Sequence, residues 1–159
     1  MISNLSSGKA SRSRNGGAHV LDVNVGLPEI DEPSMMAEVI RELQGITELP
    51  LQIDTSNTEA MARAMRVYNG KPLLNSVNGK QEVMDAVFPL VKRYGAVVVA
   101  LTLDESGIPE TADGRIAIAE KIYREAAKYG DWKKRYPDRC PVYDDQFGSA
   151  RGAYYTGDS

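Results

Sequence analysis

Hydrophobic and polar residues alternate in blocks along this chain, and the blocks repeat one plan four times. Each repeat opens with an apolar run that ends in small polar residues or an acid, which is typical of a strand. A segment follows in which apolar residues recur every three or four positions, as on one face of a helix. The four strand-like segments comprise residues 19–26, 49–57, 71–79 and 96–104.

The first two intervening segments predict helices with defined ends. Pro33 suits the first turn of a helix, where a missing N–H is not needed. The apolar positions of that helix are Met35, Met36, Val39, Ile40 and Leu43. Ser56 or Asn57 is expected to cap a second helix over residues 59–68, which Asn69 and Gly70 bring to an end.

Two further helices follow the third and fourth strands. We expect Pro89 to kink or shorten a helix over residues 81–94, and Gly95 to mark its exit. Asp113 is expected to cap the last helix, which extends from residue 115 to about residue 128. Its predicted apolar positions are Ile116, Ile118, Ala119, Ile122 and Tyr123.

Four strand–helix units with short connections imply an α/β fold with a parallel sheet and right-handed crossovers. An open doubly wound sheet and a (β/α)8 barrel both follow this plan, and periodicity does not separate them. Four or five strands are too few to close a barrel of about 250 residues, so a barrel chain of this kind would be part of something larger. Residues 1–16 and 135–159 show neither period and are expected to be irregular tails.

Composition narrows the classes of function. The chain has 159 residues, of which 42% are hydrophobic, so one soluble domain is expected. A net charge of -3, with 19 basic and 22 acidic residues interspersed, gives no basic face for nucleic acid. The single Cys140 forms no internal disulfide, and no apolar run is long enough to span a bilayer. Without a secretory signal, we expect a cytoplasmic protein.

The polar residues at the strand ends carry the candidate chemistry. In a parallel sheet these ends meet at one edge, which gathers Asp22, Asn24, Asp54, Asn75, Asn78 and Asp104. Asp54 and Asn75 end consecutive strands, so they are expected side by side. A carboxylate that accepts two N–H groups beside an amide that donates and accepts suits a flat heterocycle with an amino-amide edge, such as a pterin. The alternative is that both residues merely cap the helices that follow.

At residues 17–134 the chain resembles the pterin-binding (β/α)8 domain of cobalamin-dependent methionine synthases and of methyltetrahydrofolate:corrinoid methyltransferases, relatives of dihydropteroate synthase. The matching motifs lie at residues 21–26, 52–57, 74–80 and 101–109. The resemblance implies a partial (β/α)8 TIM-barrel in which Asp54 and Asn75 anchor the pterin ring of methyltetrahydrofolate. It also implies that Asp22 and Asn24 line the same mouth, with Asn78 and Asp104 as further candidates.

The resemblance further implies transfer of the N5 methyl group of the folate to cobalamin, a corrinoid held on another domain or protein. The lone Cys140 builds no zinc thiolate site, and no metal ligands are expected. Two alternatives remain. One is a non-catalytic half-barrel that binds or assembles, including self-association through exposed sheet edges. The other is a dihydropteroate synthase-like enzyme, which would need a phosphate-binding arginine and lysine on late strands.

The ends of the chain depart from the family pattern. A strand and helix before residue 19 and the later barrel strands are missing, so we expect the isolated fragment to be inactive. Alignment from Lys134 places Arg139 where the sixth strand would supply another pterin-binding aspartate. Reading the codons of residues 135–156 one nucleotide later allows a family-like run that begins Asp-Ile-Leu-Ile-Asp-Ala-Leu. We therefore expect a frameshift near Lys134, and a similar origin for residues 1–16.

Overall fold

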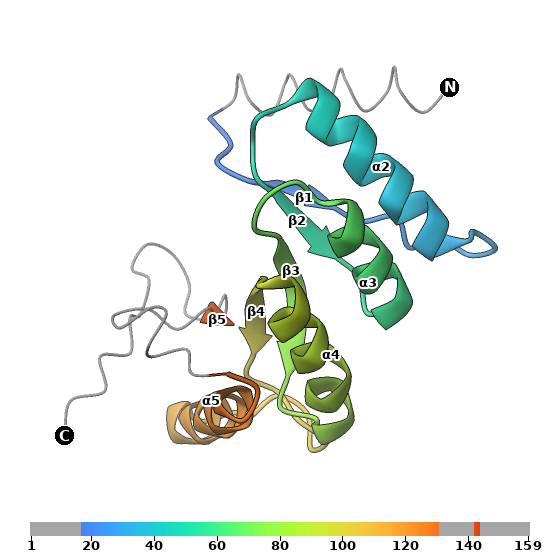
Figure 1. Ribbon diagram of the computed structural model, residues 1–159. Helices are drawn as coiled ribbons and strands as arrows, with labels where there is room; N and C mark the ends of the chain where they lie inside the picture. Colours follow the sequence, from blue (N-terminus) through green and yellow to red (C-terminus); the bar gives the residue numbers. More distant parts are fainter. Residues whose placement is uncertain (1–16, 131–141, 144–159) are drawn as a thin grey trace. The chain divides into compact units, whose positions relative to one another are not determined.

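A computed structural model of the chain describes residues 17–130 and 142–143. Strands and helices alternate, in agreement with the α/β fold expected from the sequence (Figure 1). The elements are β1 (Leu21–Val23), α2 (Glu32–Ile46), β2 (Leu51–Asp54), α3 (Thr58–Val67), β3 (Leu73–Asn78), α4 (Gln81–Tyr94), β4 (Val97–Leu101), α5 (Ala112–Ala127) and β5 (Val142–Tyr143). The chain divides into two units between Asn75 and Ser76, inside β3.

In the first unit, β1, β2 and the beginning of β3 form a parallel sheet in sequence order. The register sets Val23 opposite Ile53, and Ile53 opposite Leu74. All three side chains are buried, with exposures of 4%, 0% and 0%. Because side chains alternate along a strand, these residues define the apolar face of the sheet and their neighbours define the opposite face.

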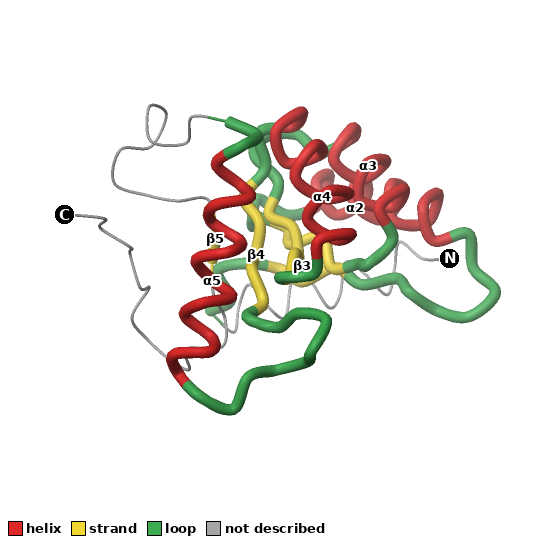
Figure 2. Tube along the Cα trace, turned by 90° about the horizontal axis from the view of Figure 1, so that it is seen from below, coloured by secondary structure: helices red, strands yellow, loops and turns green. Residues whose placement is uncertain are grey.

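Helices α2 and α3 supply the rest of the first core. They pack against each other, and Figure 2 shows them on the same side of the strands of their unit. Their buried residues recur at helical spacing and are Met36, Ala37, Ile40, Leu43, Ala60, Met61, Ala64 and Met65. Met61 and Met65, 1% and 3% exposed, belong to this core.

The second unit contains the end of β3, α4, β4, α5 and β5. Strand β4 pairs in parallel with β5, with Val98 opposite Val142, and its residues 98–100 are all buried. This burial suits a strand covered on both faces. Helix α5 packs against α4 and β4 through Ile118, Ile122 and Ala126. Ile116, another of the predicted apolar positions, is 48% exposed.

The N-terminal ends of α3 and α5 test the predicted capping residues. Asn57 caps α3 by accepting hydrogen bonds from the backbone N–H groups of Glu59 and Ala60. The predicted cap at Asp113 is wrong. Thr111 caps α5 instead, with its hydroxyl accepting from the Gly114 N–H, and the acid lies in the first turn, where it faces the positive end of the helix.

Two glycine and proline predictions have different outcomes. Helix α4 spans residues 81–94 with Pro89 inside it, so the predicted shortening is wrong. Pro89 is exposed, and the helix tolerates it there. Gly95 does end α4, in the left-handed conformation with φ of 65°, which glycine adopts without a steric penalty.

Among the described residues, no helix is long and apolar enough to cross a membrane. Arg139 and Cys140 lie outside the described residues, as do residues 1–16. Of the C-terminal segment expected to be irregular, the structure describes Val142–Tyr143, which form β5. The predictions for the remaining end residues, including the frameshift, stay predictions.

Candidate functional site

Asp54 and Asn75 are direct neighbours in the sheet of the first unit. They occupy opposite positions in the parallel register of β2 and β3, and both are half-buried. One residue further on, the Thr55 N–H donates to the Asn75 carbonyl oxygen at 3.1 Å. The side-by-side placement expected from the sequence is confirmed. Asn75 is, however, not the last residue of its strand, because β3 continues to Asn78.

Asn24 joins this pair from the end of β1. Its side-chain Nδ2 donates to Asp54 Oδ2 at 2.9 Å, although 30 residues separate the two in sequence. Its Oδ1 accepts from the backbone N–H of Gly26 at 3.0 Å. Asn24, Asp54 and Asn75 therefore form one polar layer across three adjacent strands.

Asp22 lies one layer below, toward the start of the strands. It is opposite Gln52 in the register, and Gln52 Nε2 donates to Asp22 Oδ1 at 2.8 Å. Asp22 and Asn24 are two residues apart in an extended chain, so their two layers lie about 7 Å apart. Asp22 thus shares a sheet face with Asn24, while its hydrogen bond is to a side chain that the sequence analysis did not single out. Gln52 precedes Asp54 by two positions, and strand alternation alone places both on one face.

The polar layer is not explained by helix capping. Asn57, not Asp54, caps α3. Helix α4 starts after Lys80, which provides no side-chain cap, and its first N–H, that of Gln81, donates to Glu105 Oε1 at 3.0 Å. Neither Asp54 nor Asn75 fills the structural role offered as the alternative. Both lie side by side on the face of the sheet opposite the apolar core.

A short polar chain ties α2 to the end of β2. The Thr55 hydroxyl donates to Glu32 Oε1, in the first turn of α2, and accepts from the Asn57 N–H at 3.0 Å. Thr55 is only 6% exposed. These bonds fix the backbone immediately after Asp54, so the carboxylate projects from a well-supported strand end.

Asn78 and Asp104 belong to the second unit, where each stabilises its own turn. Asn78 Oδ1 accepts from the Lys80 N–H at 3.0 Å, and Asp104 Oδ1 accepts from the Ser106 N–H at 2.9 Å. Gly79 brings the two turns together, because its N–H donates to the Leu103 carbonyl oxygen at 2.8 Å. Asparagine and aspartate commonly fold turns in this way. The structure therefore gives these two candidates a local structural role.

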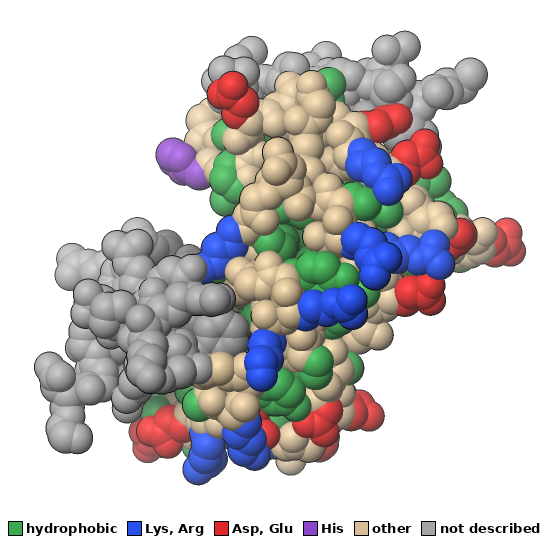
Figure 3. All heavy atoms as spheres, in the orientation of Figure 1, with side chains coloured by type: hydrophobic (Ala, Val, Ile, Leu, Met, Phe, Trp, Pro, Cys, Tyr) green, Lys and Arg blue, Asp and Glu red, His purple; other side chains and the backbone are tan. Residues whose placement is uncertain are grey.

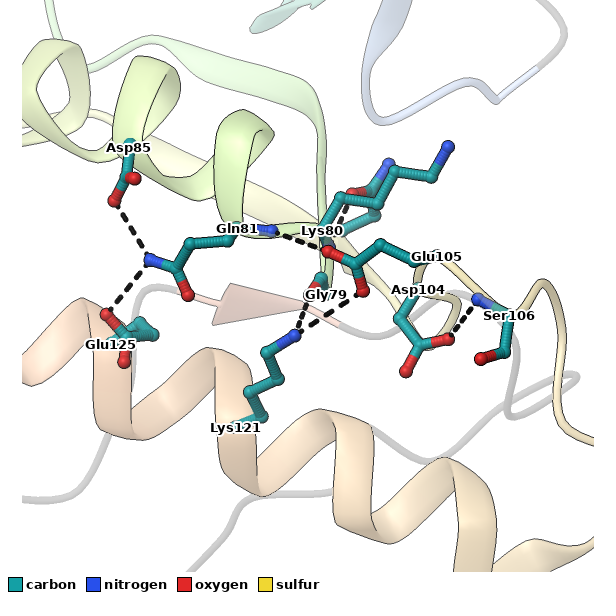
Figure 4. Close-up of polar contacts among 10 residues, drawn as sticks. Gly79, Lys80, Gln81, Asp85, Asp104, Glu105, Ser106, Lys121 and Glu125 are labelled. Carbon is teal, nitrogen blue, oxygen red and sulfur yellow. Dashed lines mark hydrogen bonds and ion pairs between the residues drawn. The ribbon is translucent and has the colours of Figure 1, made fainter.

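Lysine and glutamate side chains brace the same turns (Figure 4). Lys121 Nζ donates to the Gly79 carbonyl oxygen at 2.6 Å and lies 3.6 Å from Glu105 Oε2. The pKa of Glu105 is lowered from its ordinary value by its own backbone N–H, by that of Gln81 and, to a smaller extent, by Lys121. The start of α4 and Lys121, in the second half of α5, are thereby joined through the loop that follows β4.

The described surface carries both signs of charge, as Figure 3 shows for one face, and the single histidine, His19, is exposed there. Within residues 17–130, no three His, Cys, Asp or Glu side chains are placed to hold a metal ion. The candidate residues Asn24, Asp54 and Asn75 offer one carboxylate and two amide groups.

Comparison with a solved structure identifies the architecture. The crystal structure of 7,8-dihydropteroate synthase from Vibrio fischeri ES114 matches with a TM-score of 0.63 and 18% sequence identity, over 89% of this chain and 55% of that one. At this identity the match concerns the fold alone. The alternating strands and helices are accordingly those of a partial TIM-barrel, as the sequence analysis expected.

Sequence comparison identifies the family. The methionine synthase of Mycobacterium tuberculosis (strain ATCC 25618 / H37Rv) is 31% identical over 121 residues, and that of Mycobacterium leprae (strain TN) is 28% identical over 121 residues. Each match covers 73% of this chain and 10% of the relative, so the chain spans about a tenth of the length of these relatives. The model of the pterin binding enzyme family matches residues 7–135. The chain belongs to the pterin binding enzyme family.

Proposed function

We propose that this chain binds methyltetrahydrofolate through Asp54 and Asn75, as the pterin-binding part of a methyltransferase that moves the N5 methyl group to a corrinoid. The corrinoid is held by another domain or protein. The similarity to two methionine synthases favours this reaction over others of the family. Dihydropteroate synthase is similar at 18% identity, which supports the fold and not its activity.

One observation carries the proposal: Asp54 and Asn75 lie opposite each other in adjacent parallel strands. An ionised carboxylate offers acceptors to two N–H groups, and an amide offers a donor and an acceptor. A pterin presents an amino group, a ring N–H and a carbonyl along one edge, so the pair complements that edge. Both side chains are half-buried, which strengthens their hydrogen bonds relative to those in water.

Binding at this edge leaves the other ring of the pterin, with N5, directed away from the pair. In methyl transfer the bond between N5 and the methyl carbon breaks, N5 keeps the electron pair, and a proton or hydrogen-bond donor must stabilise it there. The corrinoid supplies the nucleophile that accepts the methyl group. The role of this chain in the proposal is to bind and orient the pterin, since orientation alone contributes substantially to such a reaction.

Isothermal titration calorimetry with methyltetrahydrofolate tests the proposal on the full chain. We expect saturable binding that is weakened by Asp54→Asn and by Asn75→Leu, each of which removes a group that faces the pterin. Gln44→Ala is the matched control. Gln44 lies near the C-terminal end of α2, and its side-chain amide exchanges two hydrogen bonds with the backbone of Asn69. A chain with a folded circular dichroism spectrum and no binding would contradict the proposal and favour a non-catalytic assembly module.

A further inference from the structure

Two hydrogen bonds fix the orientation of the Asn24 amide. Its Oδ1 lies 3.0 Å from the backbone N of Gly26, which can only donate. The oxygen of the amide must therefore face Gly26, and the NH₂ group must face Asp54. Asn24 Nδ2 lies 2.9 Å from Asp54 Oδ2, in agreement with that assignment. The backbone N–H of Gly26, in the loop after β1, thus determines which end of the amide meets the carboxylate.

The consequence for Asp54 is chemical. A donor at Oδ2 is matched only by an acceptor, so Asn24 holds Oδ2 of Asp54 as an acceptor in one orientation. A carboxylate has about four acceptor positions, and this bond occupies one of them. The remaining positions can accept N–H groups from a ligand. Among the hydrogen bonds of the described residues, the side chain to which the Asn24 NH₂ group donates is that of Asp54.

We propose that Asn24 is a positioning residue for Asp54: it holds the carboxylate as an obligate acceptor and so selects heterocycles with a 2-amino group over those with a 2-oxo group. The inference rests on the proposed pterin site and adds a selection rule to it. A 2-amino group donates to the carboxylate, whereas a 2-oxo group would place an acceptor against an acceptor. A site that is built to hydrogen-bond a group of its ligand strongly rejects an analogue that lacks this group.

The experiment measures binding of 6-methylpterin and 6-methyllumazine, which carry the amino and oxo groups respectively, to the full chain. The wild type is expected to prefer the pterin by about tenfold or more, because a hydrogen bond to a charged group is stronger than one between neutral groups. Asn24→Leu has a similar size and no donor. It is expected to weaken pterin binding about tenfold and to reduce the preference over lumazine, which a merely structural role would not change.

Asn24→Asp provides a second variant that keeps the shape and exchanges the donor for an acceptor. At neutral pH two carboxylates then meet at the position of the present bond and repel each other. A single proton shared between them restores a donor, so pterin binding by this variant is expected to recover as the pH falls toward 5. Asp22 on β1 and Glu32 on α2 are the carboxylates bonded to Gln52 and Thr55, close to Asp54 in β2, and the wild type measured over the same range controls for them.

The outcomes distinguish the positioning role of Asn24 from the proposed pterin site. If Asn24→Leu and the wild type bind both ligands alike while Asp54→Asn loses binding, the positioning role is overturned and the pterin site stands. If Asn24→Asp shows the same pH profile as the wild type, the positioning role is likewise overturned. A folded wild type that binds neither ligand would overturn the proposed function together with this inference. Gln44→Ala should match the wild type throughout.

Discussion

Replacing Gly79 by alanine tests how tightly the turns of the second unit are packed. A Cβ atom on this residue would lie 2.7 Å from Ile118 Cγ2, 2.9 Å from the Leu103 carbonyl oxygen and 3.3 Å from Asp104 Cβ. The first two distances are shorter than atoms in folded proteins tolerate. The reason for glycine here is the close approach of the β3–α4 turn to its neighbours.

The loss of stability caused by Gly79→Ala depends on whether the neighbours of the new Cβ atom can move away. Ile118 is 6% exposed, and the Leu103 carbonyl accepts the Gly79 N–H at 2.8 Å, so retreat of either neighbour breaks packing or a hydrogen bond. Overpacking of this kind costs about 1–3 kcal/mol. We expect Gly79→Ala to lower the free energy of unfolding by about 2 kcal/mol, which corresponds to a fall of about 4–8 °C in Tm for a chain of this size.

Urea unfolding followed by far-ultraviolet circular dichroism measures the effect. Gly45→Ala is the matched control, because Gly45 lies within α2 and a Cβ there has no atom within 4 Å. That substitution should raise the free energy of unfolding by about 0.5–1 kcal/mol through helix propensity. If Gly79→Ala were as stable as the wild type, the close packing of the Gly79 turn would be refuted.

Two further perturbations test individual contacts. Asn57→Ala removes the side chain that accepts two N–H groups of α3, and should lower the free energy of unfolding by about 1 kcal/mol in the same urea assay; an unchanged midpoint would exclude the cap. Glu105 has a folded-state pKa below its ordinary value of 4.5, so its stabilising effect is present above that value and is lost as the pH falls through the folded pKa. Thermal unfolding between pH 6 and pH 3 should therefore show a smaller acid-induced loss for Glu105→Gln than for the wild type, and parallel curves would contradict this.

Local chemistry made several elements predictable from the sequence. Helix α4 has the bounds that its apolar spacing and Gly95 indicate. The cap of α5 was harder, because Thr111 and Asp113 are both good capping residues two positions apart, and only the backbone conformation distinguishes them. Strand β1 is shorter than its apolar pattern suggests, since pairing with β2 extends only over Leu21–Val23.

The candidate site was predictable only in part. Asp54 and Asn75 end up adjacent because strand order and register agree with a simple βα repeat. The bond between Asn24 and Asp54 and that between Gln52 and Asp22 depend on the register of β1 with β2. Register arises from long-range pairing and from how helices seat on the sheet, so the sequence pattern did not reveal these partners.

The most direct measurement is the ratio of the dissociation constants of methyltetrahydrofolate for Asp54→Asn and for the wild type. Because the substitution replaces an acceptor by a donor at the position where Asn24 already donates, we predict a ratio of about 10 or more. A ratio near one, with both proteins folded, would contradict the claim that Asp54 recognises the pterin.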